Sequence, residues 1–409
     1  MRTLEEILAI PEIERKIYYL KKGRKTEHPN AHALYNDWNP NRHEIVIDEE
    51  KYPKIKITTK PEERITDPTT GKEYIEPAGK KDVVPNRIAL PIEQDIVNIQ
   101  TAFTVGTEPT LDCQPDQSEE SLLSALKQVF KKNKLKYQNK KVVRAWLSEQ
   151  EVAEYWYVVK DDGFWAKLKR KVAGIFGKSK PEYRLKSTIW SPFRGDKLYP
   201  FFNDNGDLVA LSREYKKKDL DDVEITCFMT ITKDMVYQWE LTSNWTDKGS
   251  FAHGFKKLPV IYMYRPEAYC EKIKSLRVRL EKLLSNYADC IDYHFFPILM
   301  LFGDVQNFSG EFKNRVVELT GQGANAQYLT WSQVPDTVKF EVETLLSQIY
   351  GLTNTPRISF DALKGTGNAV SGVTFDYVFM STHLNVENLN ETVGEFMQRR
   401  VNFLTSALG

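Results

Sequence analysis

The stretch LLSNYAD, residues 283–289, decides the predicted fold of the C-terminal half of this chain. It lies within a longer segment, residues 271–296, whose apolar side chains recur every three or four positions, as on one face of a helix. That apolar stripe consists of Ile273, Leu276, Leu280, Leu283, Leu284, Tyr287, Ile291 and Phe295. Pro297 follows, and a proline inside a helix would remove a backbone hydrogen bond. The sequence therefore predicts one long amphipathic helix that ends before this proline.

Four further segments follow this helix. Residues 298–335 contain short apolar runs broken by turn residues, which indicates a compact insert of strands and turns. Residues 336–350 return to helical spacing, and residues 351–370 form a glycine-rich loop. Residues 371–408 contain no proline and predict a third long helix. The C-terminal half is thus expected to run as helix, insert, helix, loop and helix.

The N-terminal half combines helices with a long β-rich region. Helical spacing is present in residues 1–25, 86–104 and 118–135. Residues 183–265 contain short β-branched and aromatic runs separated by turn clusters, which is typical of a mainly β region. A further hairpin is predicted at residues 65–75. The predicted fold class is therefore α+β.

The composition is that of a soluble globular chain. Of the 409 residues, 41% are hydrophobic and 28% charged, which excludes a disordered chain, a collagen and a small disulfide-rich protein. Lys+Arg 57 and Asp+Glu 56 leave a net charge of +1, whereas a general nucleic-acid coat or a polybasic membrane protein is usually more lopsided. The four cysteines form no CxxC pair, so we expect neither a structural zinc site nor a disulfide framework, and we expect a reduced compartment. The N-terminus lacks the basic and apolar regions of a signal peptide.

Motifs that would indicate an enzyme are weak in this sequence. Gly321, Gly323 and Ala326 have the GxGxxA spacing of a dinucleotide loop, but a strand is predicted after them instead of the required helix. We interpret this segment as a hairpin turn. No HExxH or GxSxG motif is present, and the six histidines are scattered. We therefore expect no enzyme activity, no metal and no cofactor, although a hydrolase or nucleotidyltransferase site assembled from distant residues stays an alternative.

The near-zero net charge hides local asymmetry. Residues 121–190 hold 17 Lys and Arg against 6 Asp and Glu. Within them, residues 163–176 form a short basic amphipathic segment. We favour a helix packed on its own domain or on a neighbouring subunit, and a peripheral membrane protein that uses this segment stays the alternative. The longest apolar run, residues 295–302, is too short to span a bilayer, which takes about 20 residues.

A second basic cluster opens the long helix. Its members are Lys272, Lys274, Arg277, Arg279 and Lys282. The helix dipole disfavours cations at this N-terminal end, so the arrangement needs another reason. The cluster is expected to meet a polyanion or acidic neighbours, or else to be an ordinary solvated surface.

Several short motifs occur in a fixed order along the chain. In chain order they are NRIALPI (86–92), LPVI (258–261), LLSNYAD (283–289), LLSQI (345–349), TPRIS (355–359) and NAVSG (368–372). This order and spacing resemble the portal proteins of tailed phages, the head-to-tail connectors, in the large portal group of long-tailed phages. The resemblance covers roughly residues 86–409.

The resemblance implies a structural protein that forms a ring, typically a dodecamer, at one vertex of the capsid. DNA is packaged and ejected through that ring. The division of the chain that it implies is a mixed α/β wing over residues 1–270, a stem of two helices at 271–297 and 336–353, a small α/β clip insert at 298–335, a tunnel loop at 354–370 and a long wing helix at 371–409. The helical crown of many relatives would be absent or truncated after Gly409.

The resemblance also implies where functional residues lie. The tunnel loop would face the DNA channel with Lys364, Gly365, Thr366, Gly367 and Asn368. The basic cluster would form a basic surface of the stem. The clip would dock partner proteins through Phe308, Phe312, Tyr328 and Trp331.

The implied partners are further copies of the chain, double-stranded DNA, terminase, the head–tail adaptor, and the major capsid and scaffolding proteins. No stable membrane insertion is expected. The location would be the capsid vertex of the virion, and the host cytoplasm during assembly. An almost neutral chain suits a conduit, because tight phosphate binding would slow the moving DNA.

Overall fold

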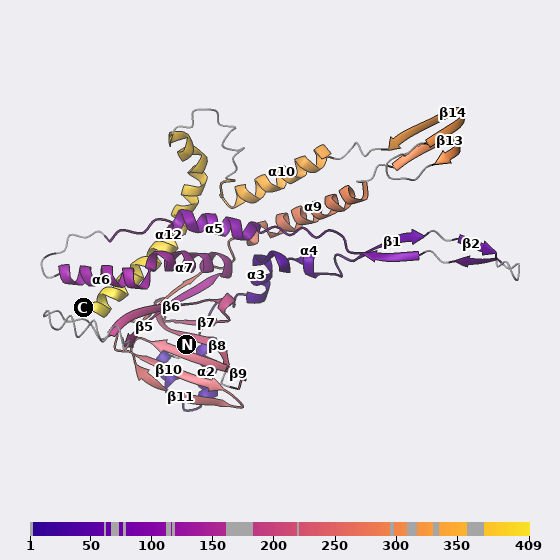
Figure 1. Cartoon of the computed structure of the whole chain (residues 1–409). Coiled ribbons are helices and arrows are strands. Elements are labelled where there is room, and N and C mark those ends of the chain that lie inside the picture. Colours follow the sequence, from indigo (N-terminus) through magenta and orange to yellow (C-terminus); the bar gives the residue numbers. More distant parts are fainter. Residues whose placement is uncertain are drawn as a thin grey trace, which may run out of the picture. The chain divides into compact units, whose positions relative to one another are not determined.

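The computed structural model is made of helices and strands, and Figure 1 shows their order along the chain. The residues it describes are 3–60, 63–66, 73–76, 79–111, 116, 119–160, 183–218, 221–294, 298–308, 317–329, 335–357 and 372–409. Two compact units are present: the first unit comprises Met1–Asn39, Pro91–Lys272 and Tyr350–Gly409, and the second comprises Pro40–Leu90 and Ile273–Ile349. Both contain helices as well as strands, so the predicted α+β class is confirmed.

The first unit is built around two antiparallel sheets. One has the strand order β12-β5-β6, and the other has the order β11-β10-β9-β8-β7. Their strands are β5 (Glu151–Lys160), β6 (Tyr183–Trp190), β7 (Lys197–Phe202), β8 (Leu208–Lys218), β9 (Glu224–Thr232), β10 (Met235–Leu241), β11 (Trp245–Ala252) and β12 (Val260–Tyr264). Successive strands of the second sheet are neighbours, as expected where short turns join antiparallel strands. The β-rich region predicted at residues 183–265 is thereby confirmed.

The N-terminal segment forms two helices instead of one. They are α1 (Leu4–Leu8), which begins with a capping box between Thr3 and Glu6, and α2 (Ile13–Lys22). Pro11 lies between them and disfavours the helical conformation of the residue before it. Ile17 and Leu20 of α2 are buried in a core cluster with aromatic residues of the second sheet, including Trp239. Burying such side chains contributes roughly 1.5–3 kcal/mol each and fixes α2 on this sheet.

Five further helices of the first unit lie in the described residues. They are α3 (Ala31–Trp38), α5 (Ile92–Val105), α6 (Glu120–Asn133), α7 (Leu135–Glu149) and α12 (Gly372–Leu408). Seven buried residues of α12 recur at alternating steps of four and three: Thr382, Val386, Leu389, Val393, Phe396, Arg400 and Phe403. Leu404, beside the last of them, is buried as well. The alternating spacing places the seven buried residues on one stripe of the helix, which faces neighbouring elements from residue 382 to residue 403.

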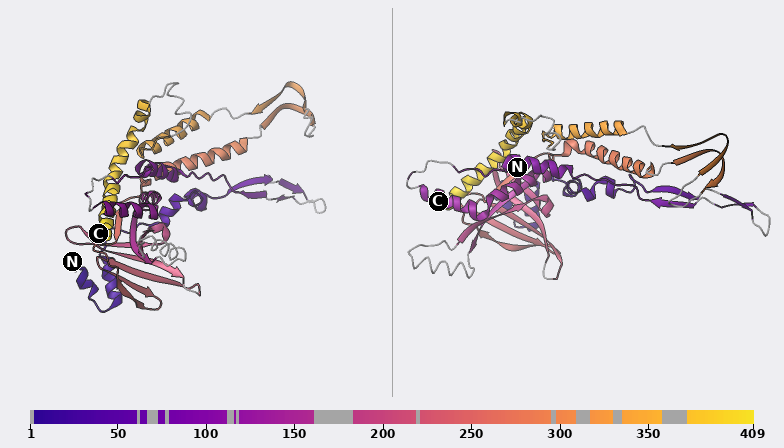
Figure 2. Two further views of the ribbon diagram at one scale, coloured as in Figure 1. Left: turned by 60° about the vertical axis from the view of Figure 1, so that its left-hand side comes forward. Right: turned by 45° about the horizontal axis from the view of Figure 1, so that its top comes forward.

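The second unit contains two long helices and an antiparallel strand pair. These are α9 (Lys274–His294), β13 (Ile298–Phe308), β14 (Val317–Leu329) and α10 (Pro335–Leu352), whose last residues belong to the first unit. The views of Figure 2 agree that α9 and α10 lie side by side and lead to β13 and β14. The predicted order of helix, insert and helix is confirmed, and the described residues of the insert form two long strands.

The interpretation of Gly321–Ala326 as a hairpin turn is wrong. These residues lie inside β14, and the connection from β13 to β14 falls earlier, at residues 309–316, outside the described residues. Phe302 pairs with Asn325, but Asp304 pairs with Thr320, so the glycine-containing residues form a bulge. Glycine favours such bulges because it has no side chain to pack and few backbone restrictions.

The rest of the second unit precedes α9 in the chain. A short helix, α4 (Glu44–Ile47), follows the single turn η1 (Pro40–Arg42). A two-stranded ribbon then extends from the pair β1 (Ile55–Lys60) and β4 (Gly79–Val83) to the pair β2 (Glu63–Thr66) and β3 (Glu73–Glu76). The predicted hairpin at residues 65–75 is confirmed. Residues 40–90 share this unit with α9, β13, β14 and α10, whereas the resemblance placed them in the wing.

Candidate functional site

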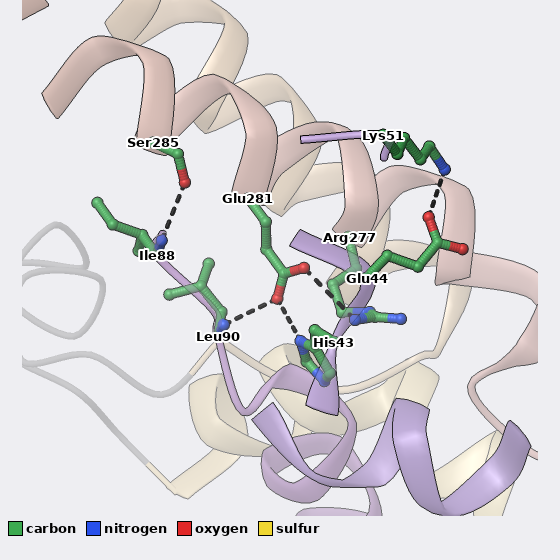
Figure 3. A network of polar contacts seen from close by, with 8 residues as sticks. All are labelled: His43, Glu44, Lys51, Ile88, Leu90, Arg277, Glu281 and Ser285. Atoms are coloured by element: carbon green, nitrogen blue, oxygen red, sulfur yellow. Dashed lines mark hydrogen bonds and ion pairs between the residues drawn. The ribbon is translucent and has the colours of Figure 1, made fainter. Parts of the chain in front are cut away.

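One face of α9 carries polar side chains at every fourth residue, and three of them accept hydrogen bonds from the backbone of residues 86–90, two of which Figure 3 shows. These residues, which we call the polar seam, are Arg277, Glu281, Ser285 and Asp289. The Glu281 carboxylate accepts the amide hydrogen of Leu90 at 2.8 Å. The Ser285 hydroxyl accepts that of Ile88 at 2.9 Å. The Asp289 carboxylate accepts that of Asn86 at 2.7 Å.

The spacing of these contacts follows from backbone geometry. Four helical residues advance about 6 Å along the axis, and two extended residues advance about 6.6 Å. Side chains at every fourth position of α9 therefore meet every second amide of residues 86–90, which run antiparallel to the helix. Hydrogen bonds to charged acceptors contribute about 1.5–3 kcal/mol each. The seam thus satisfies amides that would otherwise need a neighbouring strand.

Glu281 is the centre of this network, as Figure 3 shows. Its Oε1 lies 2.6 Å from His43 Nδ1, and its Oε2 lies 3.4 Å from Nη1 of Arg277. All three side chains are buried. A buried carboxylate is costly unless a cation and hydrogen-bond donors surround it, and Glu281 has both. The network therefore joins α9, the residue before α4 and the segment that ends at Leu90.

The expectation of a basic surface along residues 272–282 is wrong at Arg277. That guanidinium is buried, because it lies one helical turn from Glu281 on the polar seam and pairs with it. Arg279 does lie at the surface, where its Nη2 is 2.6 Å from the carboxylate of Glu341 on α10. This pair connects the two long helices of the second unit.

The three lysines of the same cluster have different surroundings. Lys272 belongs to the first unit, and its ammonium lies 5.4 Å from the ring centroid of Tyr269. Burial lowers the pKa of Lys272, although its side chain still reaches solvent. Lys274 is half-buried and Lys282 is exposed, both in the second unit. Only part of the predicted cluster is therefore available at the surface.

The expected tunnel-loop residues, Lys364, Gly365, Thr366, Gly367 and Asn368, lie outside the described residues. The chain that enters this loop is described as far as Arg357. At the end of α10, Asn354 adopts a left-handed conformation with φ 47°. Asparagine tolerates this conformation better than most side chains do. The turn at Asn354 therefore ends α10 and directs the backbone into the loop.

A buried amide of α5 holds this turn. Gln100 is fully buried, and its Nε2 lies 3.1 Å from the carbonyl oxygens of both Thr353 and Asn354 and 2.9 Å from Oγ1 of Thr355. From α12, the hydroxyl of Thr382 donates to the Asn354 carbonyl at 2.9 Å. These contacts lie within the first unit and fix the base of the predicted loop between α5 and α12.

A second residue of α12, Asn385, joins the same contacts. We call the whole set the loop-base network, and its members are Gln100, Tyr269, Thr353, Asn354, Thr355, Thr382 and Asn385. The side-chain amide of Asn385 donates to Oε1 of Gln100 at 2.9 Å and to the hydroxyl of Tyr269 at 2.8 Å. That hydroxyl in turn donates to the Thr353 carbonyl at 2.6 Å. Burial raises the pKa of Tyr269 to about 12, so the donating proton is retained over the whole physiological range.

The predicted clip residues divide between described and undescribed segments. Phe308 ends β13 and pairs with Val317, and Tyr328 lies in β14 opposite Leu299. Phe312 and Trp331 lie outside the described residues. The docking role of all four therefore stays a prediction.

Sequence reasoning missed the polar seam and the loop-base network. The seam had a readable signal, because Arg277, Glu281, Ser285 and Asp289 recur at the helical spacing of four residues. The apolar stripe drew attention to the opposite positions, of which Leu280 is buried but Ile291 is 41% exposed. Gln100 offered no such signal, because a single glutamine in an apolar helix does not indicate which carbonyl groups it will reach.

The described residues offer little for chemistry beyond structure. Among them, no group of three His, Cys, Asp or Glu side chains could hold a metal ion. Of the helices in the described ranges, none combines the length and apolar character that crossing a bilayer requires. A cavity of about 630 Å³ in the first unit is lined by aromatic side chains with Asp196 and Arg213, but these two charged groups pair with each other at 2.7 Å.

Comparison with protein families gives a match over most of the chain. The family model described as phage portal protein, SPP1 Gp6-like, matches residues 54–409, which include every helix and strand from β1 to α12. No curated protein matches the chain. Phage portal proteins are structural proteins of the capsid vertex that act as oligomeric rings in association with DNA. The chain belongs to the phage portal protein family, in its SPP1 Gp6-like group.

Proposed function

We propose that about twelve copies of this chain form a closed ring with cyclic symmetry, through which double-stranded DNA is packaged and later ejected. The observation that carries the proposal is the family match over residues 54–409. In this proposal the ring assembles in the host cytoplasm with scaffolding and major capsid proteins. It then stays at one vertex of the virion.

Exposed apolar side chains on the long helices support assembly. Phe340 on α10 is 74% exposed and Ile291 on α9 is 41% exposed, both in the second unit. In the first unit, Leu384 on α12 is 59% exposed. Single exposed apolar residues are common, but these lie on helices that the resemblance assigns to the stem and the wing. A contact between copies that buries about 1,600 Å² would cover them.

The tunnel loop is the proposed point of closest approach to DNA. Gly365 and Gly367 add little side-chain bulk, and Lys364 would supply one positive charge per copy. The loop-base network around Gln100 supports this role, because it fixes the backbone from which the loop starts.

The strand pair β13–β14 is the proposed docking element for terminase and then for the head–tail adaptor. It connects α9 to α10 and is not needed to complete either sheet of the first unit. Deletion of residues 298–335 is expected to abolish partner binding while the shortened chain still assembles. Unchanged binding after the deletion would place the docking surface elsewhere.

Electron microscopy of the purified protein tests ring formation directly. The expected result is a ring with a central hole, whose symmetry can be counted in end-on views. A stable monomer of 47.4 kDa at micromolar concentration, with no larger species under capsid assembly conditions, would contradict the proposal.

A further inference from the structure

Two helices of the first unit carry a marked excess of positive charge. Seven lysines, which we call the lysine surface, lie on α6, on α7 and between them: Lys127, Lys131, Lys132, Lys134, Lys136, Lys140 and Lys141. No Asp or Glu occurs between Glu120 and Glu149. Lys140 is half-buried, and the other six are exposed. Figure 1 shows α6 and α7 as consecutive helices.

The lysine surface differs from three consecutive lysines on β8 of the same unit, which have acidic partners. On β8, Lys216 lies 2.7 Å from Glu224, and Lys218 lies 3.3 Å from Asp222. Lys217, between them, pairs with Glu240. In the described part of the chain, no carboxylate lies at ion-pair distance from the lysine surface. Its charge is therefore not neutralised there.

Two of these lysines, Lys134 and Lys136, occupy positions that are unfavourable for the helices themselves. Lys134, which lies between α6 and α7, has a left-handed conformation with φ 53°. Lys136 lies in the first turn of α7, where the helix dipole disfavours cations and where no acidic residue is present. A cluster of like charges at such a point lowers the stability of the free protein. An anionic ligand would remove that repulsion.

The chemistry of the surface favours nucleic-acid phosphate over a protein or a membrane. Protein interfaces are usually built on aromatic and arginine side chains and are poor in lysine, but among the described residues of α7 the one exposed large apolar side chain is Tyr137. A membrane-surface helix needs an outward apolar face. Here Leu126, Leu135 and Val142 are buried, and the other large apolar residues of α6, which are Leu122, Leu123, Val129 and Phe130, are half-buried. Flexible lysines suit diffuse contacts to a phosphate backbone.

We propose that the lysine surface binds the backbone of double-stranded DNA without sequence preference, as a contact separate from the tunnel loop. The contact does not require a ring, so it goes beyond the proposed function. Each lysine that neutralises a phosphate releases counterions, and the affinity should therefore fall steeply with salt. Lys131 lies on α6, and Lys136 and Lys141 lie on α7. All three are exposed, so their substitution should not disturb the fold.

The test uses the full chain and a small, covalently closed circular duplex, which has no end that could enter an assembled channel. Binding is measured between about 50 and 200 mM salt for the parent and for the triple variant Lys131→Gln, Lys136→Gln, Lys141→Gln. The slope of log affinity against log salt should decrease by up to about 2.7 in the variant, at about 0.9 for each lost phosphate contact. Its affinity near 100 mM salt should fall at least about tenfold.

The control variant carries Lys216→Gln, Lys217→Gln and Lys218→Gln, which removes the same charge from lysines that already have partners. It should bind the circle within about twofold of the parent, and thermal unfolding should show both variants folded. The proposal is overturned if the parent does not bind the circle at 50 mM salt, or if both variants lose equal affinity. It is also overturned if the three lysines govern binding to polyglutamate or to anionic phosphatidylserine vesicles but not to DNA. If the protein forms rings that do not bind the circle, this proposal fails and the conduit role stands. If the protein binds the circle but stays monomeric, this proposal stands and the conduit role fails.

Discussion

Arg400 of α12 and Glu154 of β5 form a buried two-point ion pair. Nε and Nη2 of Arg400 lie 2.7 and 3.1 Å from the two carboxylate oxygens of Glu154. The remaining donor, Nη1, lies 2.5 Å from Oδ1 of Asn139 on α7, and Gln138 donates to Glu154 at 2.6 Å. One guanidinium thus connects the last helix, the three-stranded sheet and α7 in the first unit.

Arg400→Ala should lower the free energy of unfolding by roughly 3–5 kcal/mol, because it leaves the Glu154 carboxylate buried without its cation. The neighbouring Arg399 is a matched control, since its pair with Glu395 is exposed and such pairs contribute about 0.3–0.5 kcal/mol. Urea unfolding of both variants measures the difference. Equal losses in the two variants would show that the buried pair does not fasten α12.

Glu149 makes the stability of the first unit depend on pH. Burial raises the pKa of Glu149 to about 7, although the Phe193 amide donates to its carboxylate at 2.7 Å. Between pH 4.5 and pH 7 the folded state keeps a proton that the unfolded state releases, so this group's contribution to the free energy of unfolding decreases as the pH rises. Above about pH 7 both states are ionised and the loss is constant.

Glu149→Gln should remove this pH dependence, because the amide oxygen can still accept from Phe193 but carries no charge. Relative to the parent, the variant should become more stable as the pH rises from 5 to 7.5, by up to about 3 kcal/mol at 1.36 kcal/mol per pKa unit. Denaturant unfolding at several pH values measures this difference. Glu14→Gln, at an exposed position of α2, is the control. A constant difference between Glu149→Gln and the parent across this range would contradict the prediction.

The backbone segment that the polar seam binds should resist proteolysis only while Glu281 is present. Glu281→Ala removes the acceptor for the Leu90 amide and the carboxylate that faces Arg277 and His43. The second unit should lose roughly 3–5 kcal/mol, and limited proteolysis should cut near residues 84–90. Glu281→Gln keeps an acceptor oxygen and should lose less. Lys282→Ala changes the next, exposed residue and should leave the cleavage pattern unchanged.

The sequence could predict which segments form helices and which form strands, because this depends on the local periodicity of apolar residues. The stripe from Leu280 to Leu284 indicated α9, and the proline-free stretch after residue 371 indicated α12. The start of α5 could not be predicted in the same way. Residues 86–90 have helical apolar spacing, but the polar seam binds their amides and Pro91 follows, so the helix begins at Ile92.

The candidate site was predictable only in part, because burial of charge depends on partners far away in the sequence. Arg277 resembled its neighbours Lys274 and Arg279 as a surface cation. It is buried because it pairs with the buried Glu281, which also contacts His43. In the same way, Gln100 acquires its role from carbonyl groups at residues 353 and 354, more than 250 positions away in the numbering.

The proposed channel contact at Lys364 can be tested by reversing its charge. Lys364→Glu in a ring places one negative charge per copy opposite the DNA phosphates, so packaging should slow while ring assembly is unchanged. The defect should decrease as salt screens the repulsion. Lys256→Glu, at an exposed position between β11 and β12, is the matched control and should package normally. If the Lys364 variant packages like the parent at low salt, the loop does not contact DNA.

Ring assembly can be separated from folding at Phe340. This side chain is 74% exposed on α10, so Phe340→Ser should change the free energy of unfolding of the subunit by no more than about 0.5 kcal/mol. In the assembled oligomer, the phenyl group of Phe340 would be buried against the next copy, and its loss would remove roughly 1.5–3 kcal/mol from each contact. Because a closed ring repeats the contact, the assembly midpoint in sedimentation experiments should move to much higher protein concentration. Lys339→Ser alters the adjacent exposed residue without removing apolar surface, and it should assemble like the parent. Normal assembly of Phe340→Ser would show that this face of α10 stays in solvent, and the contact between copies would then have to lie on α9 or α12.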